Sequence, residues 1–115
     1  MYSKATLDRA KNAIYSRLAW HYLQPHRAAE RASNIVQALG GGANEDEIWD
    51  MLRCHLPFGT GRLNAVFEIR YAWVLATSDT LTEARVRLVD AGMPPFEVEP
   101  FLAQRENARF LLRAA

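Results

Sequence analysis

Residues 62–77 constrain the fold of this chain most, because they form a long, mostly apolar segment whose periodicity decides the fold class. One pattern has helical spacing and comprises Leu63, Val66, Phe67, Arg70, Trp73, Val74 and Thr77. A second pattern alternates as a strand does and comprises Phe67, Ile69, Tyr71, Trp73 and Leu75. A lone strand among helices would need a second chain to complete its hydrogen-bond ladder. We therefore predict a buried helix, with a strand over residues 66–75 as the alternative.

Start and stop signals divide the rest of the chain into further helices. Asn44 with Glu47, and Thr80 with Glu83, have the spacing of a capping box at a helix start. The glycines at 40–42 and Gly92 follow apolar helical stripes and permit the positive φ of a C-terminal cap. The predicted helices span residues 6–23, 27–39, 45–54, 62–77, 81–91 and 95–112, and Pro100 would bend or split the last one.

These segments predict an all-α fold, with residues 1–115 forming a single helical domain. We expect a compact bundle of about five or six helices in which two helical hairpins flank a central buried helix. The two glycine turns have similar surroundings, which fits either an internal repeat or the general pattern of glycine-capped hairpins. The residues expected in or beside the core are Leu18, Ile35, Ile48, Leu52, Val66, Trp73, Leu88, Val89 and Leu102.

The cysteine usage and the N-terminal sequence predict a cellular location. Cys54 is the only cysteine, so it cannot form an internal disulfide, and this fits a reducing compartment. Charges interrupt the first residues too often for a signal peptide, and no apolar run approaches the roughly 20 residues of a membrane span. We therefore expect a cytoplasmic protein that does not associate with a membrane.

The side chains that could hold a metal or carry out catalysis are poorly spaced. His21 and His26 are five residues apart with Pro25 between them. Cys54 and His55 are adjacent, so on a helix they would point about 100° apart. The sequence therefore predicts no metal, no cofactor and no enzyme, and only a large conserved pocket containing His21, His55 or Glu68 would reopen enzymatic function.

Basic and aromatic residues are interleaved near the N-terminus. Cations can contact phosphates, and aromatic rings can stack on bases or pack into a protein partner. The candidate interaction face comprises Lys4, Arg9, Lys11, Tyr15, Arg17, Trp20, His21 and Arg27. A secondary basic stripe, with spacings of four residues, comprises Arg105, Arg109 and Arg113. Both sets are also compatible with the solvated faces of an ordinary bundle.

A candidate acidic patch stands at the start of the third predicted helix and comprises Glu45, Asp46, Glu47 and Asp50. Acids are favoured in a first turn because the exposed N–H groups attract negative charge. These residues are therefore either solvated cap residues or a patch that meets a basic partner.

The preferred interpretation is a non-enzymatic protein-interaction module, such as an adaptor, an assembly factor or a small inhibitor that docks on a larger complex, including a nucleoprotein complex. The excess of aromatic residues and arginines is typical of interfaces. The alternative is a nucleic-acid-associated regulator that binds through the basic N-terminal helix face. Homodimerisation stays open, because residues 62–77 are apolar around most of the helix circumference.

Overall fold

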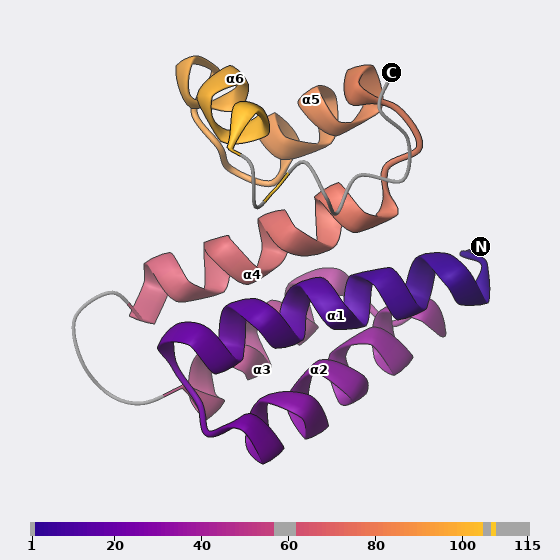
Figure 1. Ribbon diagram of the computed structural model, residues 1–115, viewed down its shortest axis with the longest axis vertical. Coiled ribbons are helices and arrows are strands. Elements are labelled where there is room, and N and C mark those ends of the chain that lie inside the picture. The colour runs from indigo at the N-terminus through magenta and orange to yellow at the C-terminus, as the bar shows by residue number, and fades with distance from the viewer. Residues whose placement is uncertain (1, 57–61, 105–106, 108–115) are drawn as a thin grey trace.

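The computed structural model describes residues 2–56, 62–104 and 107, apart from the side chains of Trp20, His21, Arg62 and Leu63. Within these residues the chain is helical and contains no strand (Figure 1). The helices are α1 (Lys4–His21), α2 (Pro25–Gly40), α3 (Glu45–His55), α4 (Arg62–Thr77), α5 (Leu81–Asp90) and α6 (Pro95–Ala103). The all-α prediction is confirmed, and residues 66–75 are helical.

Both predicted capping residues begin their helices. The Asn44 side chain accepts a hydrogen bond from the N–H of Glu47 at 3.2 Å, and Thr80 Oγ1 accepts one from the N–H of Glu83 at 3.1 Å. The Glu83 carboxylate in turn accepts from the N–H of Asp79 at 3.0 Å, one residue before the cap. These bonds satisfy amide groups that have no partner inside a helix, and so they fix where α3 and α5 begin.

The same hydrogen-bond pattern ends α2 and α5. Gly42 and Gly92 have positive φ, at 91° and 111°. The N–H of the residue after each glycine returns to a carbonyl five residues earlier, Ala43 to Ala38 and Met93 to Leu88, both at 3.0 Å. This is the Schellman arrangement, and glycine suits its left-handed position. Two chemically equivalent caps therefore form the two hairpins α2–α3 and α5–α6.

The last predicted helix, residues 95–112, is interrupted at Gln104. α6 ends at Ala103, because Gln104 is extended with φ −65° and ψ 129°. Pro100 lies inside α6, which ends three residues later, and Asn107 beyond this break is helical again, so the predicted helix is divided. Since proline has no N–H to donate to the preceding turn, it weakens the end of the helix. Of the predicted continuation to residue 112, residues 105–106 and 108–112 lie outside the described part.

Helix α4 passes through the middle of the molecule (Figure 1). Helices α1, α2 and α3 lie on one side of it, and the α5–α6 hairpin lies on the other. Every side chain from Ala72 to the end of α4 at Thr77 is buried, as is Ser78 directly after the helix. Over residues 72–78, the apolar circumference that suggested a homodimer is therefore covered by helices of the same chain. None of the described helices combines the length and the apolar character needed to cross a membrane.

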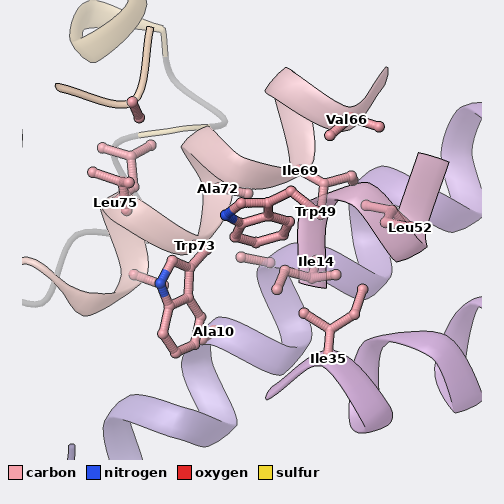
Figure 2. Packing of buried hydrophobic residues seen from close by; sticks show 14 of the residues in the cluster. Ala10, Ile14, Ile35, Trp49, Leu52, Val66, Ile69, Ala72, Trp73 and Leu75 are labelled. Atoms are coloured by element: carbon pink, nitrogen blue, oxygen red, sulfur yellow. The ribbon is translucent and has the colours of Figure 1, made fainter. Parts of the chain in front are cut away.

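The core joins side chains from every helix, and Figure 2 shows its central part, where Ile14, Trp49 and Ile69 meet. Seven predicted core residues are buried, and they are Leu18, Ile35, Leu52, Val66, Trp73, Leu88 and Leu102. Ile48 is half-buried beside them. The prediction for Val89 is wrong, since this side chain is 41% exposed. Its neighbour Leu88 faces the core, so Val89 points about 100° away from that direction.

Candidate functional site

A groove with a volume of about 540 Å³ lies between the start of α3 and the end of α5, with α4 contributing to its lining. We call it the α3–α5 groove, and it is lined by Ala43, Asn44, Glu45, Asp46, Arg70, Val74, Arg87, Asp90 and Ala91. Three consecutive helices form it, because the first turn of α3 and the last turn of α5 both lie beside α4.

The guanidinium groups of the groove interact with carboxylates of the same chain. Arg70 Nη2 lies 3.8 Å from Asp46 Oδ1, and Arg87 Nη1 lies 3.7 Å from Glu83 Oε1. Arg87 also donates a hydrogen bond of 3.1 Å to Ser78 Oγ. By contrast, Glu45 and Asp90 form no ion pair with any described residue. The groove therefore presents carboxylates that are still free to meet a cation.

The candidate acidic patch divides between the groove and the open surface. Glu45 and Asp46 line the α3–α5 groove, whereas Glu47 and Asp50 are exposed outside its lining. The structure thus assigns two of the four predicted acids to a concave site.

The candidate basic face is spread around α1. Lys4 and Lys11 are seven residues apart, so they lie on the same side of the helix, and both are exposed. Arg9 lies about 160° around the helix from Lys11. It is half-buried, and its Nη1 has no hydrogen-bond partner within the described part. Tyr15 is half-buried against the core.

Other members of the basic sets have different surroundings or are not described. Arg27 is exposed at the start of α2 and lines a smaller pocket of about 260 Å³ with Leu23, Glu30, Arg31 and His55. The side chains of Trp20 and His21 lie outside the described part, as do Arg105, Arg109 and Arg113.

Arg17, the remaining member of the basic face, belongs to an internal polar cluster. Its Nη1 donates to Glu68 Oε1 at 3.0 Å, and Tyr22 Oη donates to Glu68 Oε2 at 2.9 Å. Its Nη2 donates to Oδ1 of the buried Asn107, whose amide nitrogen donates to the Phe101 carbonyl at 2.9 Å. This cluster ties α1 to α4 and to the chain beyond α6. Arg17 therefore has a structural role.

The cluster perturbs the acidity of Tyr22. Burial raises the pKa of Tyr22 to about 12, and the hydrogen bond to Glu68 and its negative charge add to this rise. Burial also raises the pKa of Tyr71, with a smaller contribution from the charge of Glu97. The protonated Tyr22 therefore stabilises the fold fully below its unfolded pKa near 10, and this contribution is lost as the pH rises toward 12.

We expect Glu68→Gln to lower the pKa of Tyr22 part of the way toward 10, because the charge is removed while the burial remains. A tyrosinate absorbance titration measures this, and subtraction of the Tyr22→Phe titration isolates Tyr22. A Tyr22 transition that is the same with and without the Glu68 charge would contradict the assignment.

The residues considered for catalysis have different surroundings in the described part of the structure. No group of three or more metal-ligating His, Cys, Asp or Glu side chains occurs among the described residues. Cys54 is an exposed free thiol, and His55 lines the smaller pocket. Glu68 lies in the Arg17 cluster and lines neither the groove nor that pocket.

Sequence reasoning missed one surface, which lies on the α5–α6 hairpin. Val86 is 58% exposed, Val89 is 41% exposed and Phe96 is 79% exposed. Arg85 on α5 joins Glu99 on α6 through contacts of 2.5 and 3.4 Å, and this hydrogen bonding lowers the pKa of Glu99. We call Val86, Val89 and Phe96 the hairpin surface. Phe96 is the residue from which the sequence could have indicated this surface, because it does not share the helical face of Val98 and Leu102.

The fold and these surfaces define an all-α protein in which two glycine-capped hairpins and α1 surround a central helix. Comparisons with protein-family models, with curated proteins and with solved structures find no match to this chain.

Proposed function

We propose that this chain is a non-enzymatic protein-interaction module, an adaptor, assembly factor or small inhibitor, and that it docks its partner through the hairpin surface. The observation that carries the proposal is the 79% exposure of Phe96 on the same hairpin as Val86 and Val89. These are three of the four large apolar side chains exposed in the described residues, the fourth being Met51 on α3. Exposed apolar side chains that adjoin on a small protein are typical of binding sites.

Phe96 points outward because of its angular position on α6, and not because the core is poorly packed. Val98 and Leu102 are four residues apart and buried, so they define the inner face of α6. Phe96 lies about 160° around the helix from Val98. A phenylalanine on this outer face gains nothing from burial within the monomer, whereas an interface would bury it.

The test compares two serine variants of exposed residues. We expect Phe96→Ser, immobilised, to lose a partner from a lysate of the source cells that the wild type and Met51→Ser both retain. Both changes are at exposed positions, so each should alter the free energy of unfolding by no more than about 0.5 kcal/mol. Quantitative mass spectrometry of the captured proteins is the measurement. Equal capture of every protein by the two variants would contradict docking through the hairpin surface.

A nucleic-acid-associated regulator is the second candidate function. It is favoured by Lys4 and Lys11, which are exposed on one side of α1 and make no ion pair with the described residues. Phosphate contacts weaken with added salt. We expect Lys4→Glu combined with Lys11→Glu to abolish binding to duplex and single-stranded probes. Absence of binding by the wild type at low salt would exclude this candidate function. Arg17 is unsuitable for that test because it holds Glu68.

We also propose a cytoplasmic location, which the free thiol of Cys54 supports, since a reducing compartment keeps a lone cysteine unpaired.

A further inference from the structure

The charges around the hairpin surface are predominantly negative once internal pairs are set aside. Arg85 is paired with Glu99, and Arg87 is paired with Glu83. Asp90 and Glu97 are exposed and form no ion pair with the described residues. The uncompensated charge of the hairpin next to its apolar side chains is therefore carboxylate.

Apolar and acidic side chains share the exposed side of α5. Four residues separate Val86 from Asp90, so these side chains lie about 40° apart around the helix, and Val89 lies about 60° from Val86. Asp90 also lines the α3–α5 groove, as does Glu45 at the start of α3. An apolar ridge on α5 thus borders a groove that carries free carboxylates.

We infer that the hairpin surface binds a cationic amphipathic helix of the partner protein, an inference that rests on the proposed function. The apolar face of that helix packs on Val86, Val89 and Phe96. Its lysine or arginine side chains reach Asp90 and Glu97, and one enters the α3–α5 groove toward Glu45. An acidic helix would place its carboxylates against uncompensated carboxylates, which opposes binding.

The form of the partner segment follows from the elements that bind it. The described residues contain no strand, so the hairpin offers no sheet edge to which an extended peptide could add. A ridge beside a groove on a helical hairpin instead suits a helix that presents side chains at spacings of three and four residues.

The test uses two synthetic helical peptides of matched length and pattern, one built from leucine and lysine and the other from leucine and glutamate. Each is titrated into the isotope-labelled full chain, and amide chemical shifts are followed by NMR. We expect the leucine–lysine peptide to shift the amides of Val86, Val89, Asp90 and Phe96. Its binding should weaken with added salt, and the leucine–glutamate peptide should not bind.

A matched pair of charge variants locates the site. Asp90→Lys with Glu97→Lys should weaken binding of the leucine–lysine peptide roughly tenfold. Glu47→Lys with Asp50→Lys changes the net charge equally, but on exposed positions of α3 outside the groove, and should leave the affinity nearly unchanged. An equal loss in both variants would show general attraction to an acidic protein and would overturn the inference.

Other outcomes separate this inference from the proposed function. If the leucine–glutamate peptide binds the hairpin, or if a partner lost by Phe96→Ser is kept by the Asp90 and Glu97 variant, the docking function stands and the cationic partner is wrong. If the protein alone sediments as a dimer that Phe96→Ser dissociates, a second copy of this chain is the occupant and the inference is overturned.

Discussion

Replacing Trp73 with alanine is expected to lower the free energy of unfolding by about 3–5 kcal/mol, the largest effect of any single substitution considered for this protein. Trp73 lies on α4, between the two sides of the molecule, and is 1% exposed. The ring of Tyr2 packs on it edge to face, with the centroids 5.4 Å apart and the planes at 81°. Alanine would remove this contact and leave a cavity that the surrounding helices fill only in part. Urea unfolding followed by circular dichroism measures the loss.

Two further variants show whether burial of Trp73 causes this loss in the free energy of unfolding. Trp73→Phe keeps an aromatic ring and removes an indole N–H that is buried without a hydrogen-bond partner in the described residues, so we expect less than half of the loss. Phe96→Ala removes an aromatic ring at a position that is 79% exposed and should change the free energy of unfolding by no more than about 0.5 kcal/mol. Equal losses for Trp73→Ala and Phe96→Ala would contradict the core described above.

The helices could be predicted from the sequence because their boundaries depend on local chemistry. Asn44 and Thr80 accept bonds from N–H groups three residues later, and Gly42 and Gly92 provide positive φ, so each signal lies within a few residues of the boundary it sets. The bounds of α4, Arg62–Thr77, also agree with the prediction at both ends. Pro100 predicted a bend or split in the last helix, but the position of the break at Gln104 could not be predicted, because glutamine is a good helix former.

The candidate sites depend on contacts between distant residues, which periodicity does not report. In the sequence, Arg17 could not be distinguished from the exposed basic residues around it. Its guanidinium group binds Glu68, which is 51 residues away in sequence, and Asn107, which is 90 residues away. The α3–α5 groove likewise requires α3 and α5 to lie beside α4. Val89 was misassigned because both it and Leu88 are apolar, and only the packing of α5 on α4 distinguishes them.

Gly92→Ala is the second large effect that we expect, a loss of about 2–4 kcal/mol in the free energy of unfolding. Gly92 has φ 111°, where a side chain is strained, and an added Cβ would lie 2.9 Å from Cε1 of Phe67. The Phe67 ring is stacked on Tyr71 with centroids 6.0 Å apart, and the Tyr71 ring meets Phe101 of α6 at 5.8 Å. Relief of the clash would therefore disturb a row of packed rings between α4 and the hairpin.

Gly42→Ala provides the control, because Gly42 has φ 91° but nothing lies within 4 Å of an added Cβ. It should cost only the strain of the left-handed backbone, about 1–2 kcal/mol. Chemical denaturation of both variants gives the difference between them, which measures the contact with Phe67. Adding Phe67→Leu to each should then reduce the loss caused by Gly92→Ala and leave that of Gly42→Ala unchanged. Equal losses for the two glycine variants would show that backbone strain alone, and not the approach of α4 to the α5–α6 turn, requires glycine at position 92.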